Sequence, residues 1–173
     1  MHIALLPAAL RIMSSVPLSF IASFGALDVY CGPDEQWTVQ SGPNACDTSG
    51  LRAQACMLWL PLLEHEYPTM RVALLAGLAQ AGLQPVEQRL ATFPVQDLLA
   101  LALTSGASLY WVDLALKWAS QVGLAPDLIP VVRALALNLA IGQLTRHRAK
   151  RLYYTGIITL IELTWLLQNS MAS

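Results

Sequence analysis

Apolar residues recur every three or four positions through most of the chain after residue 50, which is the spacing of helices that bury one face. One phrase opens three of these stretches: a proline, a charged residue three positions later and then an apolar run, beginning at Pro68, Pro94 and Pro130. Proline is favoured in the first turn of a helix, so the phrase predicts a repeated helix start. The pattern as a whole predicts helices at about residues 51–67, 69–81, 85–91, 95–104, 108–122, 126–142 and 145–168.

The first 50 residues follow a different pattern. Residues 3–30 are mostly apolar, and residues 31–50 are polar and rich in turn-forming residues. The apolar stretch is compatible with a cleaved signal sequence, a poor membrane span or a packed helical segment, and the polar stretch predicts a loop. We therefore expect an apolar lead-in and a turn-rich loop over residues 1–50, followed by an α-helical domain over residues 51–173.

The composition indicates that much of the helical surface is hidden from water. Charged residues make up 12% of the chain and apolar residues 55%, against about 25% and about 45–50% in typical globular domains. Other helices, a partner chain or lipid could each cover this surface. A net charge of −1 provides no global attraction to nucleic acid or to an anionic membrane. The fold class that we expect is all-α, a helical bundle or short solenoid of layered antiparallel helix pairs.

Positive charge is concentrated at the start of the last predicted helix. Four cations and a histidine fall within six residues, where they oppose the helix dipole, and this cost favours a role in binding a partner. A solvated helix start and a contact with a nucleic-acid backbone are the alternatives, the latter because two tyrosines follow the cations. The predicted partner-binding residues are Arg146, His147, Arg148, Lys150, Arg151 and Tyr154.

Residues 127–136 read Asp-Leu-Ile-Pro-Val-Val-Arg-Ala-Leu-Ala, and residues 68–78 carry a similar phrase with Met70 and Arg71 in place of the Val-Arg pair. These phrases resemble the second half of a HEAT-type repeat, and the resemblance covers about residues 50–155, with Asp97 replacing the arginine in the middle unit. The resemblance implies a stack of antiparallel helix pairs that holds another protein, or occasionally a nucleic acid. It implies no catalytic residues.

Spacings that build familiar active sites are absent from the sequence. There is no glycine-rich phosphate loop, zinc-protease motif, nucleophile elbow or paired CxxC, so we expect no enzymatic activity, cofactor or metal. Glu64, His65 and Glu66 are adjacent and splay around a helix instead of converging on one metal. Asp113 and Lys117 stand four residues apart, which predicts an exposed ion pair along one helix.

The three cysteines leave two possibilities open. Cys31 and Cys46 flank the turn-rich segment, so a disulfide could close it in an oxidising compartment. Otherwise all three are free thiols, with Cys56 packed as a small apolar residue.

A membrane-anchored subunit is the alternative to an interaction module. Residues 152–167 are apolar apart from Glu162 and follow the cations, as in a C-terminal anchor, but they fall short of the roughly 20 residues of a span. We expect a non-enzymatic, cytoplasmic module for protein–protein interaction or scaffolding, which binds a partner protein or a second copy through apolar helix faces. A small membrane-embedded or C-terminally anchored subunit of a larger complex is the second reading.

Overall fold

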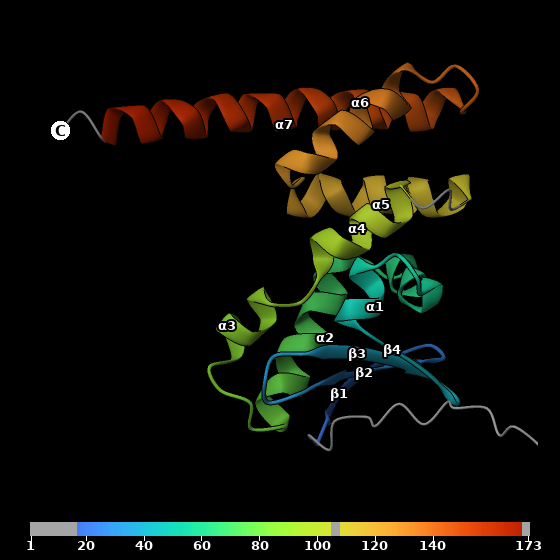
Figure 1. Cartoon of the computed structure of the whole chain (residues 1–173), viewed down its shortest axis with the longest axis vertical. Helices are drawn as coiled ribbons and strands as arrows, with labels where there is room; N and C mark the ends of the chain where they lie inside the picture. Colours follow the sequence, from blue (N-terminus) through green and yellow to red (C-terminus); the bar gives the residue numbers. More distant parts are fainter. Residues whose placement is uncertain (1–16, 105–107, 171–173) are drawn as a thin grey trace, which may run out of the picture.

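Four antiparallel strands form the N-terminal layer of the protein (Figure 1). The computed structural model describes residues 17–104 and 108–170. The strands pair in chain order and are β1 (Ser19–Phe24), β2 (Leu27–Cys31), β3 (Trp37–Ser41) and β4 (Asn44–Asp47). Tight turns at Gly25 and Gly42 join β1 to β2 and β3 to β4, and both glycines have the positive φ that such hairpin turns require.

The prediction of an all-α helical bundle is therefore wrong, and the expected loop at residues 31–50 contains two of the strands. Strands form here because buried and less buried residues alternate along the chain with a period of two. In β2, Leu27, Val29 and Cys31 are buried, whereas Asp28 between them is only half-buried. Such alternation places apolar side chains on one face of a sheet, which the helices then cover.

Helices make up most of the described chain after β4. They are α1 (Thr48–Arg52), the 3-10 helix η1 (Met57–Glu64), α2 (Tyr67–Gln80), α3 (Val86–Ala91), α4 (Val95–Thr104), α5 (Leu109–Val122), the 3-10 helix η2 (Pro126–Leu128), α6 (Ile129–Leu137) and α7 (Gln143–Ser170). The predicted helices from residue 69 to 122 and the last one are confirmed. The single helix predicted at 51–67 is wrong: α1 and η1 replace it, because Gln54 has a positive φ and Pro61 cannot donate a hydrogen bond.

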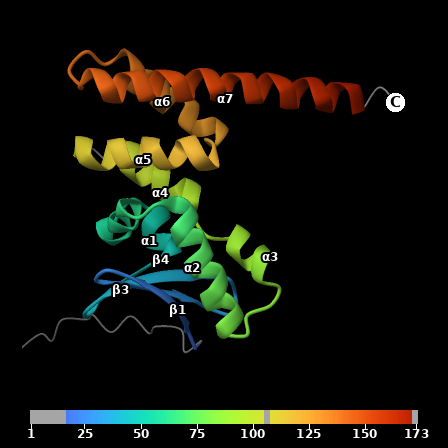
Figure 2. The same ribbon diagram turned by 180° about the vertical axis from the view of Figure 1, so that it is seen from behind.

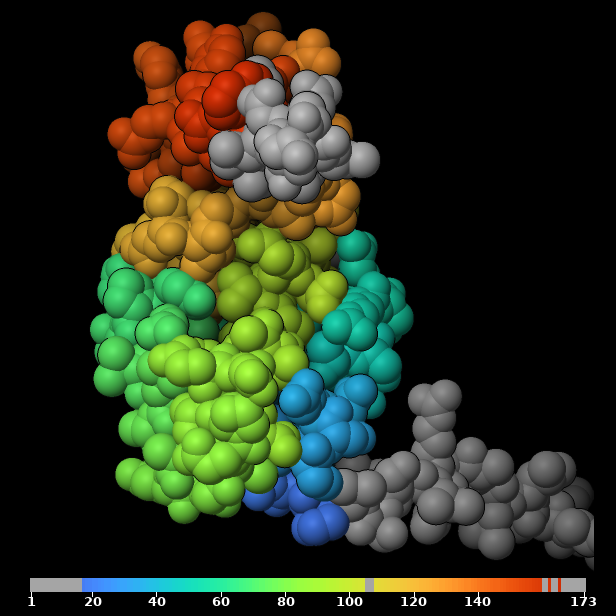
Figure 3. Space-filling view, turned by 90° about the vertical axis from the view of Figure 1, so that its left-hand side faces the viewer, coloured from blue at the N-terminus to red at the C-terminus, as the bar shows by residue number. Residues whose placement is uncertain are grey.

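The elements stack in layers along the long axis of the molecule (Figures 1 and 3). The sheet lies at one end, with α2 packed on it through β1. Next come α4 and α5, and α6 and α7 form the opposite end. Gly77 lets α2 pack directly against the backbone of β1, since a Cβ at this position would lie 1.9 Å from the carbonyl oxygen of Ile21.

One continuous core joins the sheet to the helices. The indole of Trp37 in β3 donates a hydrogen bond to the Thr92 hydroxyl (3.0 Å) and meets the ring of Phe93 edge-on, with 5.0 Å between ring centroids. Trp118 of α5 donates to the carbonyl of His65 at 2.8 Å. These buried indoles have hydrogen-bond partners far along the chain and so fix the layers relative to one another.

The cysteines are all free, and the predicted disulfide alternative is wrong. Cys31 lies on β2 and Cys46 on β4, with β3 between them. Because β2 and β4 are two inter-strand spacings apart, the Cα atoms of these cysteines are separated by at least about 9.5 Å. A disulfide requires Cα atoms within roughly 7 Å of each other. Cys46 instead contacts Cys56, and burial together with this neighbouring thiol raises the pKa of Cys46 to about 12.

Candidate functional site

All the residues predicted to bind a partner lie on the first half of α7. This helix has 28 residues and is therefore about 42 Å long. Its first half packs on α5 and α6, and its second half projects beyond the rest of the protein (Figures 1 and 2). The projecting half is the most distinctive feature of the surface.

The inner side of α7 is apolar and closely packed. Ala149 and Leu152 are buried against the layer formed by α5 and α6. At Gly156 a Cβ would lie 3.2 Å from the Cδ1 atom of Ile129, so the glycine lets α7 approach α6 closely. These contacts hold the base of the helix in a defined orientation.

An ion pair fixes α7 to α5. Arg148 Nη1 contacts the Asp113 carboxylate, and the Thr145 hydroxyl donates to the same oxygen at 3.4 Å. The predicted pair between Asp113 and Lys117 is wrong, because each side chain has a partner on another element: Lys117 pairs with Glu66 at the start of α2. Arg148 therefore already has an acidic partner within its own chain.

The outer side of α7 carries most of the other predicted residues. Arg146 is half-buried, and its Nε has no hydrogen-bond partner among the described residues. His147, Lys150, Arg151 and Tyr154 are exposed. Together with Arg148 and Leu144, these four line a shallow hollow along one face of the helix.

This exposed face continues into the projecting half. Six residues on this face are spaced alternately three and four positions apart, with a final step of seven. We call this set the α7 seam: Leu144, His147, Arg151, Tyr154, Ile158 and Trp165. All six are exposed, with relative exposures of 70% for Leu144, 56% for Ile158 and 63% for Trp165. The cations and Tyr154 were predicted from the sequence, whereas Leu144, Ile158 and Trp165 were not. Their spacing, that of a coiled-coil seam, was the signal that could have revealed them.

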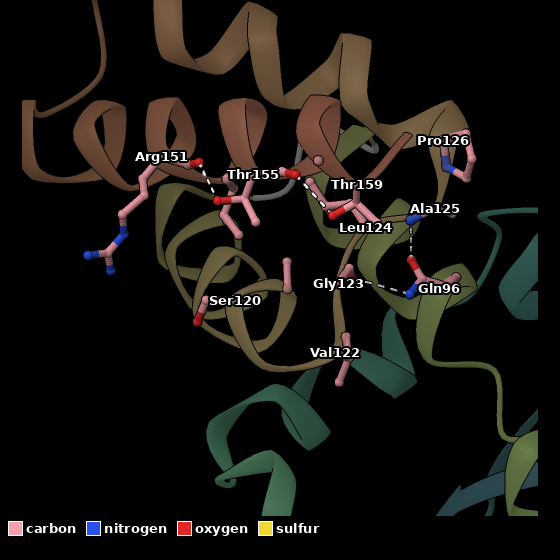
Figure 4. Close-up of a pocket in the computed structure, with 13 residues that line it drawn as sticks. Gln96, Ser120, Val122, Gly123, Leu124, Ala125, Pro126, Arg151, Thr155 and Thr159 are labelled. Carbon is pink, nitrogen blue, oxygen red and sulfur yellow. Dashed lines mark hydrogen bonds between the residues drawn. The ribbon is translucent and has the colours of Figure 1, made fainter. Parts of the chain in front are cut away.

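A second hollow, of about 640 Å3, lies beside the base of α7 (Figure 4). Apart from Arg151, most of its polar groups already have partners: Gln96 bonds the carbonyl of Gly123 (3.3 Å) and the N–H of Ala125 (2.9 Å). The hydroxyls of Thr155 and Thr159 donate to carbonyls one turn earlier in α7, both at 3.1 Å. The hollow thus offers apolar walls and few free polar groups, which suits an apolar side chain better than a polar metabolite.

The groups that could carry chemistry elsewhere have structural partners. Glu64 accepts a hydrogen bond from Tyr110 (3.0 Å), which raises the pKa of that phenol, and the pairing with Lys117 lowers the pKa of Glu66. A thiol whose pKa is raised to about 12, as at Cys46, stays protonated and is a poor nucleophile. Within residues 17–104 and 108–170, no group of three or more His, Cys, Asp or Glu side chains could hold a metal ion.

None of the helices in the described part of the chain combines the length and the apolarity needed to cross a bilayer. Comparison with known proteins gives no relative: no family model, no curated protein and no solved structure matches this chain. The resemblance to HEAT-type repeats therefore stays a prediction.

Proposed function

We propose that this chain is a non-enzymatic module that binds another protein chain through the α7 seam. The observation that carries the proposal is a helix whose projecting half presents apolar side chains to solvent. Of the twelve large hydrophobic residues exposed in the described regions, four lie on α7: Leu144, Tyr154, Ile158 and Trp165. Exposed apolar surface gathered in one region is typical of an interaction site.

The composition of the projecting half supports the need for a partner. Between residues 157 and 165, five of nine positions are β-branched, and Glu162 is the one formal charge between residues 152 and 170. β-branched residues are weaker helix formers than leucine or alanine, and an isolated helix of about 15 residues is marginal in water even with good helix formers. Packing against another surface would stabilise such a segment.

A nucleic-acid partner has less support. Binding to a phosphate backbone requires several free cations. Arg148 pairs with Asp113 and Arg146 is half-buried, which leaves Lys150 and Arg151 as the exposed cations of the cluster. The three free thiols are compatible with a reducing compartment such as the cytoplasm, where we propose that the module acts.

Site-specific photocrosslinking of the full chain in cells tests this function. A crosslinking amino acid at Ile158 should give adducts that contain a second protein chain, identified by mass spectrometry. The matched control is Val72 on α2, which is β-branched and 65% exposed but lies far from α7. Adducts of the same kind and yield at both positions, or adducts with lipid alone at Ile158, would contradict the proposal.

A further inference from the structure

We infer that Cys46 and Cys56 are a redox-responsive pair, which glutathione disulfide converts into a disulfide bond and reduced glutathione opens again. This modification site goes beyond the proposed function, because the pair lies where β4 leads into α1 and η1, and not on α7. Three observations carry the inference: the fold of the segment between the two cysteines, the surroundings of their sulfur atoms and the difference in their exposure.

The segment between the two cysteines is folded back on itself. The strand β4 leads directly into α1, and the Asp47 carboxylate accepts a hydrogen bond from the Gly50 N–H at 2.8 Å. After α1 the chain reverses at Gln54, whose φ is 53°, and the Ala55 N–H donates to the Gly50 carbonyl at 3.1 Å. The native fold therefore brings both ends of this segment back to Gly50.

The side chains of the two cysteines meet beside Gly50. A Cβ at Gly50 would lie 3.0 Å from the Cys46 sulfur and 3.8 Å from the Cys56 Cβ, so both side chains surround the same point. After burial, the neighbouring Cys56 thiol is the next cause of the raised pKa of Cys46. A disulfide forms without backbone movement only between cysteines whose side chains already face each other, and this pair meets that condition.

The two thiols differ in exposure, which assigns the order in which they react. Cys56 is half-buried between the exposed residues Ala55 and Met57, whereas Cys46 is only 6% exposed. The Cys56 thiolate therefore attacks glutathione disulfide first, forming a Cys56–glutathione disulfide and releasing one glutathione. The Cys46 thiol then loses its proton to water and attacks the Cys56 sulfur, which releases the second glutathione. Two protein thiols are oxidised to one disulfide, and one glutathione disulfide is reduced to two glutathiones.

The indole N–H of Trp59 favours the second step. Trp59 is fully buried, and its N–H has no hydrogen-bond partner among the described residues. The indole lies beside the Cys46 sulfur, where its N–H stabilises the thiolate that the attack requires. Burial still keeps this thiol protonated most of the time, so the exchange is slow and its equilibrium is the quantity to measure.

Equilibration of the purified full chain with glutathione tests the pair. In a buffer with about 1 mM each of reduced and oxidised glutathione, half of the molecules carry the disulfide if the effective concentration of the two thiols is about 1 mM, as for a short flexible linker. Thiols held in contact should exceed this value, so we expect the disulfide in more than half of the molecules. After acid quenching, alkylation of the unfolded chain should find one free thiol in place of three, and a peptide map should locate the link between Cys46 and Cys56.

Two variants and the unfolded chain are the controls. Cys56→Ser should abolish the loss of thiols, whereas Cys31→Ser, which replaces another buried cysteine of the sheet, should leave the link unchanged; circular dichroism should show that both variants are folded. The ratio of disulfide to dithiol should be at least about tenfold higher in the folded chain than in the same chain in urea, because the native fold holds the thiols together. A folded chain that stays mostly reduced, that carries only a glutathione adduct at Cys56, or that is oxidised no more than the unfolded chain would overturn the inference.

Discussion

Replacing Gly77 with alanine should destabilise the protein by separating α2 from the sheet. A Cβ at this position would lie 1.9 Å from the carbonyl oxygen of Ile21 and 2.7 Å from its carbonyl carbon. Cβ atoms in real structures essentially never come closer than 3.0 Å to another atom. The obstacle is the backbone of β1, which cannot rotate aside, so the helix has to move by about 1.1 Å.

Two opposing terms set the size of the effect. Alanine is a better helix former than glycine and would stabilise an unobstructed helix by about 1 kcal/mol. Overpacking against a backbone costs about 1–3 kcal/mol. A shift near 1 Å also removes part of the dispersion contacts of Leu74 and Leu78, which are fully buried on the same helix. We expect a net loss of about 1–2 kcal/mol, equivalent to about 2–8 °C in melting temperature for a chain of this size.

Gly156→Ala is the matched control, because it makes the same substitution in another helix. There the nearest atom to a new Cβ is the flexible end of Ile129, at 3.2 Å, which can move by a few tenths of an ångström. We expect this variant to be about 0.5 kcal/mol more stable than the wild type. Urea unfolding at one fixed protein concentration, followed by circular dichroism, compares the two. Equal stability of the two variants, or a Gly77→Ala variant as stable as the wild type, would show that α2 does not need glycine to pack on β1.

Two further predictions concern the anchoring of α7 and the cap of α1. A double-mutant cycle with Asp113→Asn and Arg148→Met should give a coupling free energy below about 1 kcal/mol, because both side chains are partly exposed; a value near 3 kcal/mol would contradict this. Asp47→Ala should lower the free energy of unfolding by about 1 kcal/mol near neutral pH, because this carboxylate caps α1. Hydrogen bonds from the Ser49 hydroxyl and the Gly50 N–H lower the pKa of Asp47, so the stabilisation is present above its ordinary pKa of 3.8 and is lost as the pH falls through the folded-state value. Urea unfolding of wild type and variant between about pH 7 and pH 3 measures this, and a difference that does not shrink with falling pH would refute it.

The helices after residue 67 could be predicted because their signals are local. Prolines at the starts of α2 and α6 preset the backbone for the first turn, and Gly123 ends α5 with a positive φ of 80°. Each signal acts within a few residues of the boundary that it marks. The break in the helix predicted at 51–67 was not predictable in this way, because the positive φ of Gln54 has no local sequence signature.

The sheet was missed because the apolarity of its segment concealed its alternation. Ile21, Leu27 and Val29 lie in a stretch apolar enough to resemble a signal sequence, although the residues between them alternate in burial. The turns at Gly25 and Gly42, each between two short runs of alternating residues, were the available evidence for hairpins. A mean apolarity does not distinguish a strand from a helix, whereas the period of the pattern does.

The exposed face of α7 and the pairing of its cations could not be predicted from the sequence, because both depend on contacts with residues far away in the chain. Four cations within six residues identified the helix as a candidate site, but Arg148 is paired with Asp113, 35 residues earlier in the chain. The spacing that places Ile158 and Trp165 on one stripe is also the spacing of every helix that buries a face in its own core. Only the packing of α5 and α6 against Ala149 and Leu152 shows that this stripe is the outer one. Because α7 is apolar on two sides and the described residues of its own chain cover only one, we propose that a partner binds to the second.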